Sequence, residues 1–418
     1  MGSDKAGQSG VQVARQAYAP CQMPYHRWLD ISRRYAARPA IFDGGKAVTF
    51  ADLRAGLAQL PQAVSPVIAR SGGWDFFLQI LRGWRDGQAV IPVERDAPEP
   101  ELLHAPAPGI CLVKYTPGAS GIPRGIFFNA DQVAADGDRI VNAMRLTPDV
   151  PNLGVISLAH SYGFSNVVLP LLLHGVPVHL APVPFPRVVE EIFKCHESIV
   201  VPAVPSMWRA WHRAGILTEA PIRLALSAGA PLALALEQDV FTASGLKIRN
   251  FYGASECGGI SLDDTDTPRK SADDVGTPLP GVAVSINEGG RIVVKSDGVA
   301  TGYDSTRNDD HLGDQIYQTR DLGFFDSRGR LHLTGTLGGA INVAGRKISP
   351  AKVEAAILST GLVERVRVFG TSSSDPERFE EISAEVKMMP GATLDTLKQA
   401  ATGALQNWET PRHWKIET

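Results

Sequence analysis

Short β-branched and apolar runs alternate with longer amphipathic stretches over most of this chain, and this alternation restricts the fold more than any other feature. Residues 63–70 (AVSPVIAR) predict a strand, residues 74–87 (WDFFLQILRGWRDG) a helix ending at Gly87, and residues 88–93 (QAVIPV) another strand. Parallel strands need a long crossover, usually a helix, so this order indicates a partly parallel sheet. The sequence therefore predicts an α/β fold with mixed sheets flanked by helices.

The pattern changes toward the carboxyl terminus. Residues 290–335 read as short antiparallel strands, residues 349–360 as a capped helix, and residues 365–371 and 381–390 as strands. We predict a large α/β domain over residues 1–337, with residues 1–20 flexible, and a small, mobile C-terminal α+β domain over residues 338–418. The paired glycines at Gly338 and Gly339 fit a hinge, but a simple turn is the plainer interpretation of such a spot.

Composition excludes several classes of protein. The 418 residues carry 41 Lys and Arg against 44 Asp and Glu, a net charge of −3, and 44% are hydrophobic, which is typical of a globular chain rather than a disordered one. Because no basic run offers a field for phosphate backbones, we expect no nucleic-acid partner. The cysteines form no CxxC pair and have no histidine at zinc-ligand spacing, so we expect reduced thiols.

One stretch approaches the length of a membrane span. Residues 166–186 (NVVLPLLLHGVPVHLAPVPFP) are apolar, but their prolines and their glycine favour a buried helix followed by a buried strand. The first twelve residues are small and polar, unlike a signal peptide or anchor. We therefore expect a cytoplasmic protein without a membrane span.

The segment with the most chemical information is residues 111–125 (CLVKYTPGASGIPRG). An apolar strand leads into a loop of small and hydroxyl residues that ends at Arg124, and a second strand follows. Backbone amides, hydroxyls and one cation suit a loop that binds phosphate, although the spacing of a Walker loop is absent. Taken alone, this composition favours a glycine-rich hairpin without a chemical role.

Several ordered motifs make the chain resemble the acyl-adenylate-forming enzymes, which include acyl-CoA synthetases, peptide-synthetase adenylation domains and luciferases. The loop resembles their phosphate signature YTSGTTGxPKG, residues 227–232 (SAGAPL) their adenine-side turn, residues 250–256 (NFYGASE) their NxYGxTE stretch, and residues 317–323 (YQTRDLG) their YxTGDLG segment. Residues 159–163 (AHSYG) and 48–53 (VTFADL) also match. The resemblance covers about residue 40 to the end of the chain, and ordered motifs together are far more specific than any one of them.

The resemblance implies roles for individual residues. Glu256 would bind Mg²⁺, Ser255 would donate to the α-phosphate, and His160 would lie beside the reacting carboxylate. Tyr252 would stack on adenine, and Asp321 would accept both ribose hydroxyls. The other residues implied in nucleotide binding are Thr116, Gly118, Ser120, Gly121, Arg124, Gly229, Ala230, Pro231, Asn250, Phe251 and Gly253, and those implied in binding the acid are His160, Ser227 and Gly258.

Each of these residues also has a structural interpretation. Glu256 and Asp321 could be solvated loop acids, Tyr252 a core aromatic, and His160 a core histidine with satisfied hydrogen bonds. Gly258 and Gly259 could leave room for a ring or acyl chain, or could simply form a tight turn. Trp208 and Trp211 are expected in a helix core rather than in a site.

The sequence departs from the family pattern at some of these motifs. Pro117, Ala119 and Arg124 replace the loop's serine, threonine and lysine. Thr336 stands where the family has an arginine. The sequence ends at Thr418, before the family's lysine-containing segment, and Lys415 does not replace that lysine. Loss of one positioned cation costs roughly 2–4 kcal/mol of transition-state stabilisation, so we expect slow adenylation.

Two functions follow from the resemblance. The first is ATP- and Mg²⁺-dependent activation of a small carboxylic acid, aryl or fatty, as acyl-AMP, with transfer to CoA or to the phosphopantetheine of an acyl or aryl carrier protein. The alternative is a catalytically impaired homologue that binds nucleotide, acyl-adenylate or carrier protein without efficient turnover. A hydrolase is disfavoured because neither a GxSxG nor an HExxH motif appears.

Overall fold

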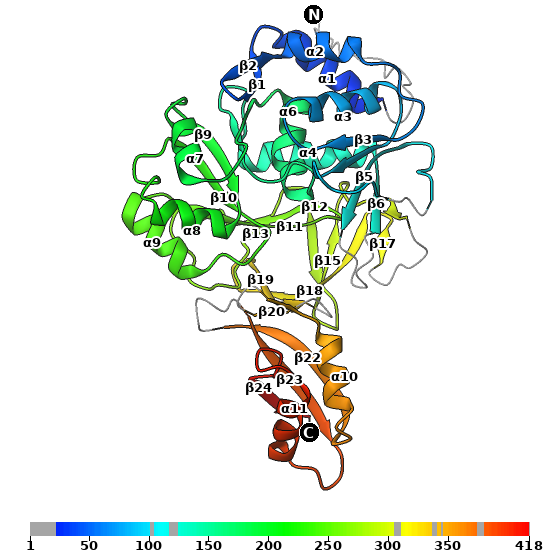
Figure 1. Ribbon diagram of the computed structural model, residues 1–418, viewed down its shortest axis with the longest axis vertical. Coiled ribbons are helices and arrows are strands. Elements are labelled where there is room, and N and C mark those ends of the chain that lie inside the picture. Colours follow the sequence, from blue (N-terminus) through cyan, green and yellow to red (C-terminus); the bar gives the residue numbers. More distant parts are fainter. Residues whose placement is uncertain are drawn as a thin grey trace, which may run out of the picture.

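Strands linked by helices build two mixed sheets in the N-terminal part of the chain, as the alternating pattern predicts. The computed structural model describes residues 22–100, 104–116, 124–304, 311–336, 341–343, 346–373 and 380–417. A large upper part, ending with β18 (Ile316–Phe325) and β19 (Leu331–Thr336), lies above a smaller C-terminal part that contains α10 (Pro350–Leu358) and α11 (Leu394–Ala404) (Figure 1). The predicted fold class, a large α/β domain followed by a small α+β domain, is confirmed.

The largest sheet carries two of the matched motifs at neighbouring strand ends. In spatial order its described strands are β13 (Thr277–Pro278), β12 (Gly258–Leu262), β11 (Ile248–Ala254), β10 (Ile222–Ser227), β9 (Ile199–Ala203), β7 (Asn152–Gly154), β8 (Val178–Leu180), β1 (Pro39–Asp43) and β2 (Lys46–Thr49). The pair β10 and β11 is parallel, with Ser227 opposite Asn250. The turn after β10 and the segment at the end of β11 therefore meet at one edge of the sheet, where α/β proteins bind ligands.

A second mixed sheet supports the glycine-rich loop. Its described strands are β16 (Gly302–Tyr303), β6 (Arg124–Asn129), β5 (Ile110–Thr116), β4 (Val90–Val93) and β3 (Val67–Arg70). β3, β4 and β5 are parallel, whereas β5 and β6 are antiparallel with Thr116 opposite Arg124. The predicted strands before and after the loop are thus confirmed. Residues 117–123, which include Gly118, Ser120 and Gly121, lie outside the described residues.

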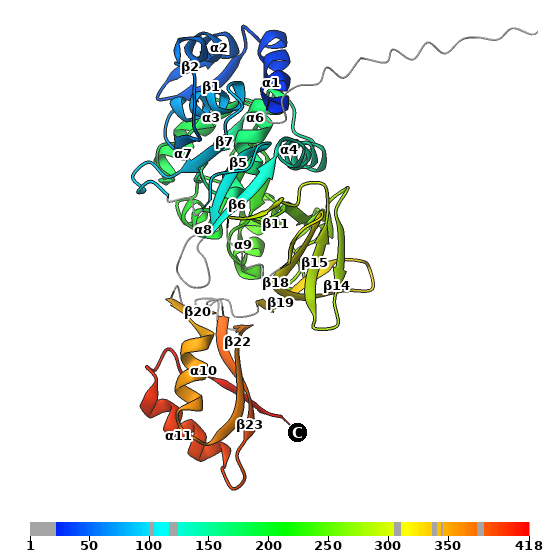
Figure 2. The same ribbon diagram turned by 90° about the vertical axis from the view of Figure 1, so that its right-hand side faces the viewer.

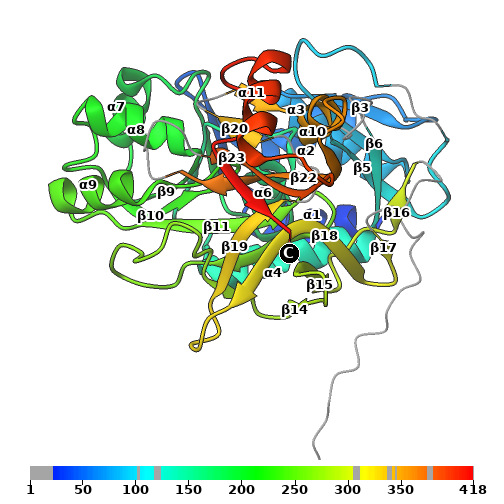
Figure 3. The same cartoon turned by 90° about the horizontal axis from the view of Figure 1, so that it is seen from below.

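Helices cover both sheets, and two of them, α2 (Phe50–Gln59) and α4 (Ala130–Met144), begin at side-chain capping boxes. Thr49 and Asp52 form a capping box at one helix start, and Asn129 and Gln132 form another. The helices are α1 (Met23–Arg34), α2 (Phe50–Gln59), α3 (Asp75–Arg85), α4 (Ala130–Met144), α5 (Ser161–Gly163), the π-helix η1 (Phe164–Val168), α6 (Leu169–His174), α7 (Pro186–Phe193), α8 (Pro205–Arg213) and α9 (Leu234–Ser244). Seen from below, α7, α8 and α9 lie on the opposite side of the molecule from β3, β5 and β6 (Figure 3).

The apolar stretch of residues 166–186 folds as predicted into a buried helix, α6, and a buried strand, β8. Trp208 and Trp211 are fully buried on α8, as expected for core residues. Within the described ranges, no helix is both long enough and apolar enough to cross a membrane.

An antiparallel sheet follows and leads toward the small C-terminal part. Its described strands are β14 (Ala283–Ile286), β15 (Arg291–Lys295), β18 (Ile316–Phe325), β17 (Leu312–Gly313) and β19 (Leu331–Thr336). β18 and β19 pair with Asp321 opposite Thr336. In the side view, β18 and β19 lie at the lower edge of the large part, above β20 and β22 (Figure 2). This sheet therefore carries Asp321 to the junction of the two parts.

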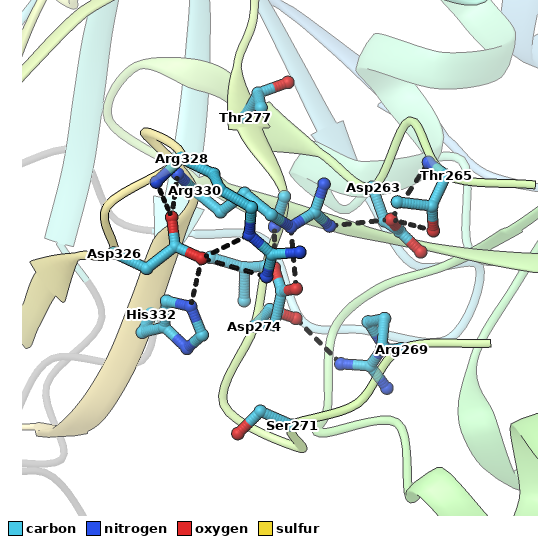
Figure 4. Close-up of polar contacts among 12 residues, drawn as sticks. Asp263, Thr265, Arg269, Ser271, Asp274, Thr277, Asp326, Arg328, Arg330 and His332 are labelled. Atoms are coloured by element: carbon cyan, nitrogen blue, oxygen red, sulfur yellow. Dashed lines mark hydrogen bonds and ion pairs between the residues drawn. The ribbon is translucent and has the colours of Figure 1, made fainter. Parts of the chain in front are cut away.

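A buried group of ion pairs ties this sheet to the largest one. Arg330, before β19, donates to Asp263 and Asp274 at 2.8 Å each (Figure 4). Arg269 donates to Glu237 at 2.8 Å, and Lys247 contacts Glu237 and Asp263. We call the set Glu237, Lys247, Asp263, Arg269, Asp274 and Arg330 the charge network. Buried charges must be paired, and here every one of them is.

The small C-terminal part has its own hydrophobic core, formed by residues such as Val353, Ile382 and Leu397. Its elements are β20 (Ile341–Val343), β21 (Arg346–Ile348), α10 (Pro350–Leu358), β22 (Val363–Ser372), β23 (Glu380–Met388), α11 (Leu394–Ala404) and β24 (His413–Ile416). Ser349 caps α10, as predicted. The proposed domain boundary at residues 337–338 and the proposed flexible residues 1–20 lie outside the described residues.

Candidate functional site

A pocket of about 670 Å³ lies where the strand ends of the large part meet the small part. Its walls come from the turn after β10, the end of β11, the start of β12, the helices α5 and η1, Asp321 on β18 and the end of β19. Gly370, Ser373 and Glu380 of the small part complete it. This volume is within the usual range for a small-molecule site.

The turn after β10 gives the pocket one backbone-lined edge. Gly229 has a φ of +80°, a left-handed conformation that favours glycine, and it redirects the chain toward α9. Gly229, Ala230 and Pro231 all line the pocket. All three stand where the sequence predicts nucleotide-binding residues.

The end of β11 supplies the neighbouring wall. Asn250, Phe251, Tyr252, Gly253 and Ser255 line the pocket. The amide of Asn250 donates to the carbonyl of Asp274 at 3.1 Å, which anchors the strand to the loop beneath it. A Cβ atom on Gly253 would lie 2.7 Å from the carbonyl oxygen of Gly258, so glycine is needed there.

Asp321 lines the pocket with both carboxylate oxygens already hydrogen-bonded. The Tyr252 hydroxyl donates to Oδ2 at 2.6 Å, and the Thr336 hydroxyl donates to Oδ1 at 2.7 Å. Burial and the nearby charge of Asp321 hold the pKa of Tyr252 well above its usual value, so the phenol stays a donor. Each carboxylate oxygen keeps a further lone pair for another donor.

Glu256 and Arg124 lie close to each other but are not among the lining residues of the pocket. The Tyr303 hydroxyl donates to Glu256 at 3.0 Å, and the guanidinium carbon of Arg124 lies 4.1 Å from the centroid of the Tyr303 ring. Burial raises the pKa of Glu256 above its usual range. Thr116, opposite Arg124 in the β5–β6 pair, is at the same end of the strands. The structure thus brings three of the predicted residues to the base of the loop.

A magnesium ion would need more than the protein offers here. The described residues contain no group of three or more His, Cys, Asp or Glu side chains able to hold a metal. Mg²⁺ often takes one protein carboxylate and completes its shell with water and phosphate oxygens. Glu256 therefore fits as a ligand of Mg²⁺ only when a bound polyphosphate supplies further oxygen ligands. The positive charge of the ion would then favour the ionised form of the Glu256 carboxyl group.

Two predicted acid-binding residues are not among the pocket-lining residues. The side chain of His160 is 70% exposed, so it is not a core histidine, and its Nε2 lies 3.4 Å from Oε1 of Glu94. Ser227 is fully buried, and its hydroxyl has no hydrogen-bond partner in the described part of the chain. Their roles in binding an acid stay predictions.

Gly258 lines the pocket, and the structure gives a reason for glycine at this position that does not involve a ligand. It has a φ of +71°, and a Cβ atom would lie 2.0 Å from Oδ1 of Asp136. Asp136, on α4, also accepts from the backbone amide of Gly259 at 3.3 Å. The glycine therefore lets a buried carboxylate approach the pocket wall.

Sequence reasoning missed the residues beside this carboxylate. Ser165 and Asn166 line the pocket from η1, and Ser165 donates to Asp136 at 2.5 Å. One sequence feature could have pointed to them: Ser165 and Asn166 are two polar residues inside an otherwise apolar run. Gly258 and Gly259, which line the same pocket, follow much later in the chain. The π-helix that presents Ser165 and Asn166 has no reliable sequence signature.

The fold and the pocket define a two-part α/β protein with a pocket between its parts, and comparison with known proteins gives the family. Residues 77–304, more than half of the chain, match the family model "AMP-binding enzyme". The chain belongs to this family, and its resemblance to the acyl-adenylate-forming enzymes is confirmed.

Individual relatives are distant. The long-chain-fatty-acid–CoA ligase of Bacillus subtilis is 24% identical over 331 residues, covering 74% of this chain and 59% of the ligase. The 3,4-dihydroxybenzoate–[aryl-carrier protein] ligase of Bacillus anthracis is 27% identical over 281 residues, covering 66% and 62%. The chain thus spans about three fifths of the length of these curated relatives.

Solved structures show the same fold. ATP-bound MatB from Rhodopseudomonas palustris matches with a TM-score of 0.65 at 19% identity, covering 95% of both chains. O-succinylbenzoate coenzyme A synthetase from Bacillus subtilis in complex with AMP matches with a TM-score of 0.67 at 17% identity, covering 94% of both chains.

Proposed function

We propose that this protein uses ATP to activate a carboxylic acid, aryl or fatty, as acyl-AMP in the pocket between its two parts. It then transfers the acyl group to the thiol of CoA or of a carrier protein's phosphopantetheine. The observation that carries the proposal is the pocket itself, lined jointly by Gly229–Pro231, Asn250–Ser255 and Asp321. The named activities of the similar ligases support the reaction class.

In this proposal, different pocket-lining residues bind different parts of the nucleotide. The turn at Gly229–Pro231 and the ring of Tyr252 border the adenine, while the carboxylate of Asp321 accepts from the ribose hydroxyls through its remaining lone pairs. Ser255 donates to the α-phosphate. ATP supplies the leaving pyrophosphate, and the protein holds the acid and the α-phosphate in line.

The remaining predicted residues act at the phosphates and the metal. Thr116 and Arg124, at the base of the loop, and Gly118, Ser120 and Gly121 within it would hold the outer phosphates. Glu256 would take Mg²⁺, with Tyr303 orienting its carboxylate. Because the loop carries proline and alanine in place of two hydroxyl residues, we expect a weaker hold on phosphate than in a loop with the full motif.

Calorimetry and product formation test the proposal together. ATP with Mg²⁺ and a panel of aryl, short and long acids should yield hydroxamates in the presence of hydroxylamine, and AMP should bind the protein alone. If AMP does not bind and no acid gives product, the proposed function is wrong.

A second candidate, a homologue that binds an adenylate without efficient turnover, is favoured by one specific feature. Thr336, whose short and uncharged side chain donates to Asp321, stands where the family motif has an arginine. The nucleotide would therefore lack one neighbouring cation. This candidate predicts AMP binding without hydroxamate from any acid. The same two measurements therefore separate the candidates.

A further inference from the structure

The wall of the pocket formed by α5 and η1 differs in its polarity from the nucleotide side. Ser161, Tyr162, Ser165 and Asn166 line the pocket there, and Gly258 and Gly259 line it from β12. Ser165 and Asn166 are only 3% and 2% exposed, so a ligand that reaches them meets side chains with little access to water. Their hydrogen-bonding capacity then decides what can bind.

The donors of this wall are already used by the protein. The Ser165 hydroxyl donates to Asp136 at 2.5 Å, and the Asn166 amide donates to the carbonyl of Tyr162 at 3.1 Å. The Tyr162 hydroxyl lies 3.4 Å from the carbonyl oxygens of Ala203 and Leu226. Beside Ser165, the amide of Gly259 donates to the other carboxylate oxygen of Asp136.

The acceptors, in contrast, are still available. The side-chain oxygen of Asn166 is buried and has no partner within the described ranges. The Ser165 oxygen has committed its single proton, so toward any further group it can only accept. A buried acceptor without a partner costs about 1–3 kcal/mol, which a donor on a ligand would recover. Ser161, at the more exposed end of the wall, can do either.

Two basic residues lie near the carboxylate behind this wall. Arg139, one turn after Asp136 on α4, donates to the carbonyl oxygens of Cys257 and Gly259 at 3.3 Å each. Lys114 on β5 is buried with its Nζ 4.9 Å from the centroid of the Phe128 ring; burial lowers the pKa of its amine, and the charge of Asp136 opposes that shift. Because basic groups already lie beside Asp136, the wall suits a neutral donor better than an ammonium group.

We propose that the acid taken by this pocket carries a neutral hydrogen-bond donor, a hydroxyl group, whose single proton the oxygens of Ser165 and Asn166 accept together. This inference rests on the proposed function and narrows its substrate class from acids in general to donor-bearing acids. Asp136 acts as a positioning residue, since it holds the proton of Ser165 and keeps the serine oxygen an acceptor. A site that hydrogen-bonds a substrate hydroxyl strongly rejects an analogue that lacks this hydroxyl. An apolar pocket rejects a substrate with an additional hydroxyl only weakly.

Matched stable adenylate analogues test the inference by binding, without requiring turnover. The probes are 5′-O-(N-acylsulfamoyl)adenosines in two series, benzoyl with its 2-, 3- and 4-hydroxy forms, and hexanoyl with 6-hydroxyhexanoyl. In calorimetry we expect at least one hydroxylated probe to bind about tenfold or more tightly than its parent. In Ser165→Ala and in Asn166→Leu the ratio between the affinities of the hydroxylated probe and its parent should shrink to about threefold or less.

The outcomes separate failure of this inference from failure of the proposed function. If AMP and the parent probes bind but no hydroxylated probe gains affinity, the inference is overturned and the proposed function stands. If the advantage persists in both variants, the assignment to Ser165 and Asn166 is overturned. If not even AMP binds, the proposed function fails, and the inference fails with it.

Discussion

The charge network and the pocket hold their carboxylates in different ways. In the network, Asp263 is fully buried and pairs with Lys247 and Arg330. Burial alone would raise its pKa, but the bonds from Lys247 and Thr265 hold the pKa of Asp263 below its usual value. In the pocket, Asp321 is held by two neutral hydroxyls instead. The cations around Asp263 stabilise the fold, whereas the two hydroxyls leave Asp321 without a cationic partner among the described ion pairs, which fits the ligand-binding role that we propose for it.

The largest effect that this comparison predicts is on stability. Arg330→Met leaves the buried Asp274 without its cation and Asp263 with Lys247 alone, so we expect a loss of about 3–5 kcal/mol in the free energy of unfolding. Urea denaturation measures it. Arg328→Met is the matched control, because the Arg328 side chain is 66% exposed and, within the described residues, forms an ion pair with Asp326 alone. The variant should lose no more than about 0.5 kcal/mol of unfolding free energy. Equal losses would contradict the distinction.

The next effect should fall on binding rather than on the fold. Asp321→Asn removes the charge and replaces one acceptor with a donor that faces a hydroxyl. We expect AMP to bind roughly 30- to 100-fold more weakly, equivalent to about 2–3 kcal/mol, with a loss of unfolding free energy near 1 kcal/mol. Calorimetry measures the affinity for AMP. The weak binding of 2′,3′-dideoxy-AMP should not change, and if it falls as much as that of AMP, Asp321 does not recognise the ribose hydroxyls.

A smaller effect tests the hydroxyl partners themselves. Thr336→Val keeps the shape of the side chain but removes the donor to Asp321, so AMP should bind about three- to tenfold more weakly. Thr336→Ser retains the hydroxyl and should restore wild-type affinity. If the serine variant is as weak as the valine variant, the methyl group matters and the hydrogen bond does not.

The same comparison shows which features a sequence can reveal. The strand–helix alternation and the turn glycine Gly229 depend on local preferences, so the fold class and the strand ends with their motifs were predictable. The hydroxyl that holds Asp321 comes from a residue fifteen positions away, and the family comparison marked Thr336 only as a missing arginine. The Ser165–Asp136 bond joins a π-helix to α4, 29 residues apart. Such contacts depend on packing between elements, which periodicity does not encode.

The smallest predicted effect is on the pH dependence of stability. It comes from a third arrangement, in which two histidines share a hydrogen bond with each other. Nδ1 of His179 lies 2.7 Å from Nε2 of His196, and the ring of His179 stacks on Phe42 at 5.4 Å. Burial, with a contribution from His196, lowers the pKa of His179 to about 4. Burial also lowers the pKa of His196. The folded protein therefore favours two neutral rings sharing one hydrogen bond.

The sign of the pH dependence follows from these shifts. An unfolded histidine titrates near pH 6.5, so above that pH both states are neutral and the pair keeps its full contribution. As the pH falls from about 6.5 toward 4, the unfolded chain gains protons that the folded pair resists, and stability is lost. Because solvent reaches part of the pair and screens it, we expect a loss of only about 1 kcal/mol between pH 7 and pH 5. In His179→Phe, which preserves the ring contact with Phe42, the unfolding free energy measured in urea should fall less over this range than in the wild type. Identical slopes in the two proteins would show that this pair does not set the pH dependence and that carboxylates such as those of the charge network do.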